Sequence, residues 1–375
     1  MYISKYFLTF VFSVVIIFAQ LVSAKALFQP GQTTRSLGMG GTYIAFARGV
    51  DALYYNAAAL ARNEGFSFTL AEVQPSISTN AQRLADQSQG NGSSVTASDL
   101  NDLYGKTFFL DVNARSGFVF PYWGAGAYST NYIVESFSNP VFPTFNVEFV
   151  SDYGYLVSGA VPLGSQTSLG LTGRHVKRWG GEQDILVTSL IGTDDQALIE
   201  STITDKGTGN AMDVSFLHSF DGDWNPSIAA VWYDLGNTKF NPTTGNGPPQ
   251  QENNLVFGAS AQRKIPMGTW TSSLEYKYIQ QTGSLSKKIH LGTEVSLGLI
   301  DLRAGLYQGY FTYGVALDFS FLRIEAASYT VELGNSAGQS PSERYQASIS
   351  LNLDFDQAFK LKTSDGKKRR LMQRR

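Results

Sequence analysis

The sequence predicts an all-β protein, a 14-stranded antiparallel transmembrane β-barrel with an N-terminal plug. Composition is the first reason, because only 16% of residues are charged, against roughly 25% in ordinary soluble domains. Aromatic residues reach 13% and glycines number 37. Alternation of apolar and polar residues over barrel-strand lengths is the second reason. The third is a Gly- and Ala-rich segment that precedes every such run. A secreted array of β-sandwiches is the alternative.

The pattern of residues 1–24 predicts a secretory signal peptide. Lys5 is followed by an apolar core at 6–18 and by the small residues Val22-Ser23-Ala24. This core is too short to span a bilayer and ends at a cleavage site. No cysteine lies at the junction, which argues against a lipoprotein. We therefore expect a signal peptide at 1–24, a plug at 25–65, a barrel at 66–355 and a basic periplasmic tail at 356–375.

The stretch 36–62, SLGMGGTYIAFARGVDALYYNAAALAR, is the predicted plug. Its glycines permit sharp bends and close approach of other groups, and its alanines suit tight packing in a confined space. Asp51 is expected to cap a helix that runs through Tyr54 and Leu60. The candidate plug motif consists of Gly38, Met39, Gly40, Gly41, Asp51, Asn56 and Ala57. A surface helix after a Gly-rich turn is the alternative, and a phosphate-binding loop is disfavoured because no Lys-Ser/Thr follows.

Fourteen strands are predicted from period-2 alternation and turn residues. They are 66–78, 108–121, 124–137, 145–161, 165–179, 209–219, 224–234, 254–264, 268–281, 285–296, 300–308, 311–319, 321–332 and 343–355. Short connections alternate with longer ones, clearly in the first half of the chain and less so later. Bacterial barrels combine an even strand number with short periplasmic turns and longer external loops. This pattern places both termini in the periplasm of an outer-membrane protein.

Strand parity predicts which side chains face lipid. In the last strand, Ile349 and Leu351 point outward and Ser350 points into the lumen. A slip of one residue exchanges the two faces. Aromatic residues near strand ends are expected to form the two interfacial girdles: Tyr122, Trp123, Trp179, Trp224, Trp270, Tyr310 and Phe311. The loop stretches 94–106 and 194–206 each predict a short helix, either folded over the barrel mouth or solvated.

The pattern GMGG followed by DALYYNAAALA resembles the N-terminal hatch of the FadL-type outer-membrane family. That family shows Asn-Pro-Ala-Gly-Leu-Ala where this chain has Asn56, then three alanines, Leu60 and Ala61. Ala57 thus replaces a proline that would fix φ. The segments 231–240, 288–319 and 343–355 resemble late-barrel segments of FadL-type and PorV-type proteins. The resemblance implies passive uptake of hydrophobic small molecules, of the long-chain fatty acid or aromatic hydrocarbon type. A PorV-like role as a partner or shuttle in protein secretion or envelope assembly is the alternative.

Catalytic chemistry has few candidate residues. The chain holds three histidines and no cysteine, and no zinc-ligand spacing is present. His290 shares a strand with Glu294, and Ser273 or Ser286 would lie near, but such pairs are more often satisfied lumen hydrogen bonds than triads. We expect no enzyme activity, no metal and no cofactor.

Late strands carry charges of both signs at inward positions. This lumen polar network comprises Glu275, Lys277, His290, Glu294, Asp301, Arg303, Asp318, Arg323 and Glu325. Pairing across strands and bonding to the plug backbone is the favoured interpretation, because buried polar groups need partners. A polar conduction path is the alternative.

The tail holds eight Lys or Arg residues and one Asp between Lys360 and Arg375. Like charges at this density predict disorder. Expected surroundings and partners are outer-membrane lipid and lipopolysaccharide, a hydrophobic ligand, and a periplasmic or secretion partner. Nucleic acid is not expected in that compartment.

Overall fold

The computed structural model describes residues 27, 31–83, 104–138, 144–186, 204–355 and 361–362. The predicted signal peptide 1–24, most of the loop helices predicted at 94–106 and 194–206, and most of the tail lie outside these residues. Within them, no helix combines the length and apolar character needed to cross a membrane.

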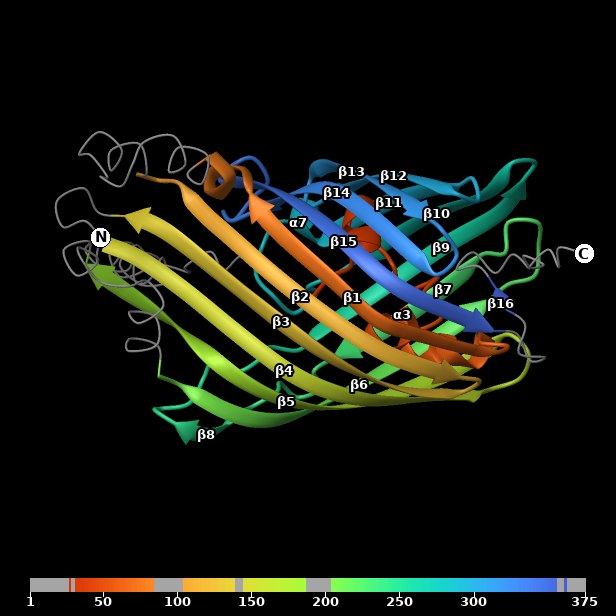
Figure 1. Ribbon diagram of the computed structural model, residues 1–375, viewed down its shortest axis with the longest axis horizontal. Coiled ribbons are helices and arrows are strands. Elements are labelled where there is room, and N and C mark those ends of the chain that lie inside the picture. Colours follow the sequence, from red (N-terminus) through yellow and green to blue (C-terminus); the bar gives the residue numbers. More distant parts are fainter. Residues whose placement is uncertain are drawn as a thin grey trace, which may run out of the picture.

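Fourteen antiparallel strands close into a barrel, which confirms the predicted fold class. Each strand pairs with its neighbour in sequence order, and β1 pairs with β15 to close the ring (Figure 1). The barrel strands are β1 (Phe66–Ser78), β2 (Thr107–Phe120), β3 (Trp123–Ser138), β4 (Thr144–Pro162), β5 (Thr167–Leu186), β6 (Lys206–Ser219), β7 (Ser227–Tyr233), β9 (Asn254–Ile265), β10 (Gly268–Tyr276), β11 (Ile289–Ser296), β12 (Ile300–Tyr307), β13 (Tyr310–Asp318), β14 (Leu322–Glu332) and β15 (Pro341–Phe355).

Three short elements depart from the predicted strands. The strand β8 (Asn241–Thr244) lies in the connection after β7 and pairs with β6. Part of the predicted strand 285–296 is instead a helical turn, α7 (Leu285–Lys288), and β10 ends at Tyr276 rather than at 281. Leu361 and Lys362 form β16, which pairs with the end of β15. Two residues of the predicted basic tail thus extend the sheet.

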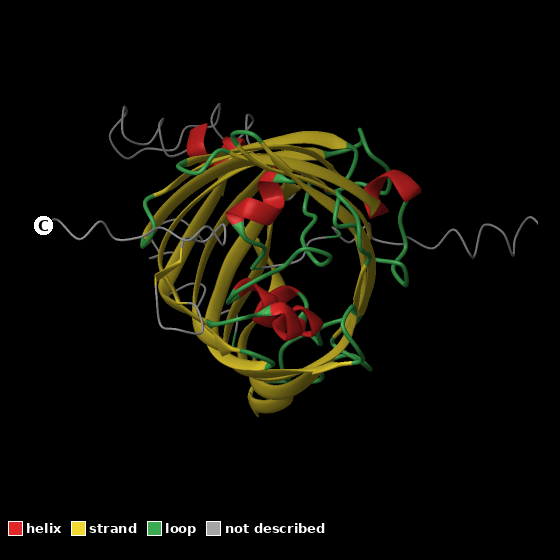
Figure 2. Ribbon diagram, turned by 90° about the vertical axis from the view of Figure 1, so that its right-hand side faces the viewer, coloured by secondary structure: helices red, strands yellow, loops and turns green. Residues whose placement is uncertain are grey.

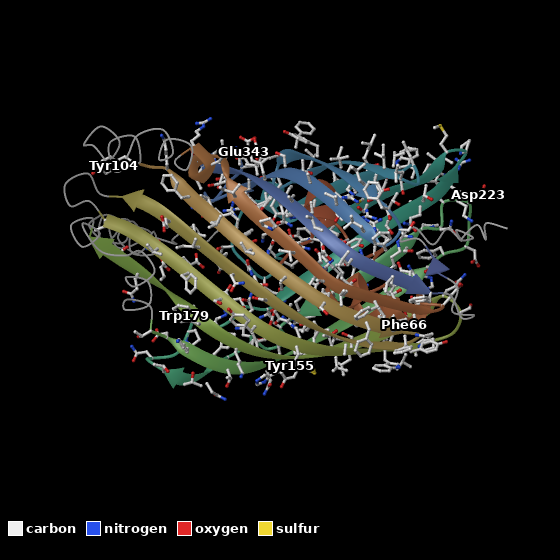
Figure 3. The ribbon with its side chains drawn as sticks, viewed as in Figure 1. Phe66, Tyr104, Tyr155, Trp179, Asp223 and Glu343 are labelled. Atoms are coloured by element: carbon white, nitrogen blue, oxygen red, sulfur yellow. The ribbon has the colours of Figure 1, made fainter. Side chains whose placement is uncertain are left out.

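The two ends of the barrel differ in their connections. At one end, here called the turn end, short segments such as 121–122 and 266–267 join the strands. The other end, the loop end, carries the longer connections between β1 and β2 and between β5 and β6. Tyr104 and Glu343 lie at the loop end, and Asp223 lies at the turn end (Figure 3).

Alternate residues face opposite sides of the wall, as the predicted register requires. In β15, Ile349 is 56% exposed and Ser350 is 4% exposed. On β4, alternation also predicts an outward position for Val147, Tyr153, Tyr155 and Val157. The last three are exposed, whereas Val147 is buried. Apolar residues therefore cover the outer face of the strands, and polar side chains line the lumen.

Aromatic side chains gather on the outside at the turn end. Phe120 and Trp123 stack with ring centroids 5.2 Å apart. Trp224 and Trp270 meet edge to face at 5.5 Å. Amphipathic aromatic rings at this position suit the boundary between hydrocarbon and water. Trp179 lies nearer the loop end, where the Lys206 ammonium lies 4.9 Å from its ring centroid.

The segment 31–65, here called the lumenal segment, lies inside the ring of strands (Figure 2). It contains two short helices and a 3₁₀ helix: α2 (Thr34–Gly38), α3 (Asp51–Tyr55) and η1 (Ala57–Arg62). Its apolar side chains, among them Met39, Ile44 and Leu60, form the largest buried cluster together with wall residues such as Val119 and Leu217. The hydrophobic core of the protein is thus formed by apolar side chains of this segment packed against the inner face of the barrel wall.

The described ends of the chain lie at opposite ends of the barrel. The Leu27 carbonyl accepts a hydrogen bond from Gln308, which follows β12 at the loop end. The Leu27 side chain lies beside Gly283, also at the loop end. The last barrel strand ends at Phe355 at the turn end. The lumenal segment therefore crosses the lumen from loop end to turn end before β1 begins, so the two described ends do not share one side.

Candidate functional site

An ion-pair network ties α2 to the barrel wall. Arg35 donates to both carboxylate oxygens of Glu294, at 2.9 Å from Nε and 2.5 Å from Nη2. Arg303 Nε lies 2.7 Å from Glu294 and its Nη2 lies 2.9 Å from Glu325. All four side chains are at least nine-tenths buried. Bidentate pairs of this kind fix geometry as well as charge, so the helix has one defined position against β11.

Other members of the predicted polar network complete these contacts. Arg323 lies 2.9 Å from Glu325 and 3.2 Å from Asp318, and it also pairs with Asp301. Charges of both signs therefore neutralise one another across β11 to β14. A buried charge without a partner would destabilise the fold strongly.

The remaining network residues hold the backbone of the glycine turn. Glu275 accepts hydrogen bonds from the backbone N–H groups of Tyr43 and Ile44, the latter at 2.6 Å. Lys277 donates to the Gly41 carbonyl, and His290 Nδ1 donates to the Gly40 carbonyl at 2.8 Å. The nine predicted network residues thus form two contiguous groups, one on Arg35 and one on the turn at residues 40–44.

Glycines on both surfaces permit the turn to touch the wall. A Cβ at Gly40 would lie 2.1 Å from the Leu291 carbonyl oxygen, and a Cβ at Gly305 would lie 2.4 Å from the Gly40 nitrogen. Gly40 also has φ +67°, a conformation that favours glycine. Gly292 on β11 meets the Met39 carbonyl in the same way. The contact is therefore backbone against backbone, and any side chain at these positions would separate the two surfaces.

Asp51 does not cap its helix, contrary to the expectation from sequence. It is the first residue of α3, and the preceding residue Val50 makes no side-chain cap. Its carboxylate instead accepts from the Tyr43 hydroxyl and from Arg115 Nη2, the latter at 2.5 Å. The competing partner is an arginine on β2, which sequence position alone does not reveal. Asp51 therefore links the lumenal segment to the early strands.

Asn56 divides the helix that was expected to continue to Leu60. Its backbone is extended, with φ −160° and ψ 96°. Its side-chain oxygen accepts from Ala58 N at 3.0 Å, and its amide nitrogen donates to the Ile44 carbonyl at 2.8 Å. Asn56 is thus the cap of η1. The chain turns here with Ala57 in place of the proline of the related motif.

A cavity of about 160 Å³, here called the loop-side chamber, lies between the lumenal segment and the wall. Its aromatic lining is formed by Tyr54, Tyr55, Tyr128, Tyr233, Phe240 and Tyr278. Two of the hydroxyls are engaged by backbone carbonyls, since Tyr233 donates to Tyr55 O at 2.6 Å and Tyr54 donates to Ser116 O at 2.8 Å. Burial raises the pKa of Tyr55 to about 12, so this phenol is neutral at physiological pH.

Three arginines line the same chamber, and each is paired with acidic side chains. Arg115 lies 2.6 Å from Glu72 and Arg178 lies 2.7 Å from Asp152. Arg174 lies 2.8 Å from Asp213 and 3.0 Å from Asp234. None of the three arginines is among the site residues predicted from the sequence. The sequence pattern that could have identified them is a charged residue at an inward position of a strand whose outer face is apolar.

A row of polar residues crosses five strands at one level of the loop-side chamber. Gln74, Asn113, Thr130, Asp152 and Arg178 are successive register partners from β1 to β5. All five line the chamber. We call them the polar row. Side chains directly opposite in antiparallel strands lie close together, so the row presents a continuous polar strip.

A second cavity of about 280 Å³, the turn-side chamber, lies on the other side of α3. Its lining includes Asp51, Asn63, Asp354 and Phe355. Arg115 lines both chambers. The ion pair between Arg115 and Asp51 therefore stands at the boundary between them.

In the part of the chain that the structure describes, no group of three His, Cys, Asp or Glu residues is arranged to hold a metal ion. His290 binds the Gly40 carbonyl rather than an acidic partner. Ser273 bonds to Thr42, with 2.5 Å between the two hydroxyl oxygens.

A closed barrel of 14 antiparallel strands with an apolar outer face has the architecture of outer-membrane β-barrels. No protein family model and no curated protein matches the sequence. Among solved structures, the fold is similar to a loop-deletion mutant of the monoaromatic hydrocarbon channel TodX, with a TM-score of 0.52 and 13% identity over 86% of this chain and 98% of that one.

Two toluene transporters are similar at the same level. TodX of P. putida has a TM-score of 0.50 and 13% identity over 86% of this chain and 98% of its own. TbuX of Ralstonia pickettii has a TM-score of 0.50 and 14% identity over 84% of this chain and 96% of its own. The chain therefore has the barrel fold of TodX and TbuX.

Proposed function

We propose that this protein is a passive outer-membrane channel for hydrophobic small molecules, and not an enzyme. The observation that carries the proposal is the pair of lumen chambers separated by α3, with Arg115 in the lining of both. A ligand entering from the loop end would reach the aromatic wall of the loop-side chamber. It would leave through the turn-side chamber after α3 shifts, or sideways through the barrel wall.

The lining suits a neutral ligand. Each arginine of the loop-side chamber is already paired with a carboxylate, so an uncharged molecule displaces no ion pair. Burial of its apolar surface against tyrosine rings provides the attraction. Residues 25–65 would act as the plug, with the glycine turn fixed on β11 and β12. The contact between Asp51 and Arg115 would be the one that changes.

Vesicle uptake tests this function. Purified protein is reconstituted into liposomes, and entry of labelled toluene and of a long-chain fatty acid is compared with entry into protein-free liposomes. We expect protein-dependent entry of at least one of the two compounds. Equal entry with and without protein would overturn the channel proposal.

A PorV-like role as a partner in secretion or envelope assembly is the second candidate. The observation in its favour is the charged lining of the loop-side chamber, with three arginines and their acidic partners. Such a barrel would copurify from native membranes with a stoichiometric protein partner, and the basic residues beyond Phe355 would provide a periplasmic contact. Copurification of lipid or small ligand alone would contradict it.

A further inference from the structure

We propose that the loop-side chamber binds a monocyclic aromatic molecule that carries a hydroxyl group, such as a phenol. This inference rests on the proposed channel function and specifies the class of its substrate. It follows from three features of one site: the volume of the chamber, its aromatic wall, and buried polar atoms of the polar row and Arg115 that have no hydrogen-bond partner.

Gln74 and Asn113 supply two free acceptors. The amide nitrogen of Asn113 donates to Asp111 at 2.7 Å, and that of Gln74 donates to Glu72. Because each NH₂ group faces a carboxylate, the orientation of each amide is set and its oxygen points elsewhere. Gln74 Oε1 and Asn113 Oδ1 accept no hydrogen bond, although the residues are only 1% and 5% exposed.

Arg115 supplies a free donor beside them. Its Nε and Nη2 atoms bind Glu72 and Asp51, while Nη1 has no partner. Arg115 follows Asn113 on the same face of β2, two residues along the strand. A hydroxyl group both donates and accepts. One hydroxyl can therefore donate to an amide oxygen of the polar row and accept from Arg115.

The rest of the chamber fits an aromatic ring. An apolar cavity of roughly 150 Å³ holds one benzene molecule, and this chamber measures about 160 Å³. Tyr54 and Tyr128 lie edge to face with ring centroids 6.3 Å apart, on the same side as Arg115. A ring can stack here while its hydroxyl reaches the polar row. A plain hydrocarbon would leave the polar atoms unpaired, which disfavours its binding.

Equilibrium dialysis of the purified full chain against radiolabelled phenol and benzene tests the inference. We expect saturable phenol binding that is about tenfold tighter than benzene binding. Asn113→Leu should weaken phenol binding by about tenfold and leave benzene binding equal or stronger. Asn131→Leu is the matched control, because Asn131 does not line the chamber and its oxygen already accepts from Ser151. A parallel dialysis of detergent without protein measures partition into the micelles, and this value is subtracted from every sample.

The outcomes separate the inference from the channel proposal. Benzene binding as tight as phenol binding, or an unchanged ratio in Asn113→Leu, would overturn the hydroxyl preference while leaving a hydrocarbon channel in place. Gln74→Met provides a second variant with the same expectation if Asn113→Leu fails to show heat-modifiable folding. Selective phenol binding without protein-dependent phenol entry into liposomes would support the site and overturn transport. Saturable binding of neither compound would overturn the inference outright.

Discussion

Arg35 of the lumenal helix α2 and Glu294 of strand β11 form a buried bidentate ion pair, with contacts of 2.9 and 2.5 Å. The two residues come from opposite parts of the chain, so the pair joins the segment inside the barrel to its wall. Arg303 shares the same carboxylate. The ion pair that positions α2 is therefore part of the same network of charged side chains that links the late strands.

Removal of this pair should loosen the lumenal segment. Arg35→Gln leaves the Glu294 carboxylate with Arg303 alone, and breaking a buried pair typically costs about 3–5 kcal/mol. The urea midpoint of heat-modifiable folding is the measurement. Lys264→Gln is the control, because Lys264 is an exposed residue of β9 and a surface change stays within about 0.5 kcal/mol. Equal midpoints for the two variants would show that the pair does not hold the segment.

The glycine contact makes a sharper structural test. Gly305→Ala places a Cβ 2.4 Å from the Gly40 nitrogen, and forced separation in a packed core costs about 1–3 kcal/mol. We expect higher leak conductance in planar bilayers and faster proteolysis of the segment 31–65. Gly173→Ala is the matched control, since no atom lies within 4 Å of its Cβ position. Leak that rises equally in both variants would refute a seated segment.

Strand facing predicts a depth-dependent charge effect. Ile349 is exposed near the middle of β15, so Ile349→Arg should reduce folding free energy by about 2–4 kcal/mol in a bilayer. Glu343 lies on the same strand and face but at the loop end (Figure 3). Glu343→Arg should therefore change it by at most ~1 kcal/mol. Assembly yields in liposomes measure both effects, and equal yields would contradict the assignment of Ile349 to the lipid-facing middle of the wall.

Alkaline pH should weaken the lumenal contacts through Tyr55. Burial raises the pKa of Tyr55 to about 12, against about 10 in an unfolded chain. As pH rises above the lower value, the unfolded chain loses this proton first, so stability falls between about pH 10 and 12. Tyr55→Phe should show a smaller loss over this window in urea unfolding. An unchanged slope would exclude Tyr55 as a contributor.

Truncation after Phe359 should leave the barrel folded. It removes the eight basic residues of the predicted tail and the short strand β16, but none of the fourteen barrel strands. Heat-modifiable gel migration of the truncated protein is the measurement. A protein that migrates only as the unfolded form would show that β16 or the tail is required for folding.

Period-2 alternation was sufficient to predict the number of strands and the facing of Ile349 and Ser350, because a lipid-facing wall imposes that pattern directly. It also placed Glu294 and Arg303 in the lumen. The assignment of Asp51 as a helix cap was wrong because a local rule cannot detect a competing partner on β2. The polar row escaped detection for a related reason: its members are adjacent only through strand register.

The path of the lumenal segment has a consequence for the order of assembly. This segment enters at the loop end and leaves at the turn end, and the first and last barrel strands then meet, with Phe66 opposite Phe355. A segment that touches the wall backbone against backbone, as at Gly40 and Gly305, is inserted more easily while the ring is still open than through a sealed lumen. We therefore expect the β1–β15 seam to form around a segment that is already in place, so that the interior acts as a template on which the wall closes.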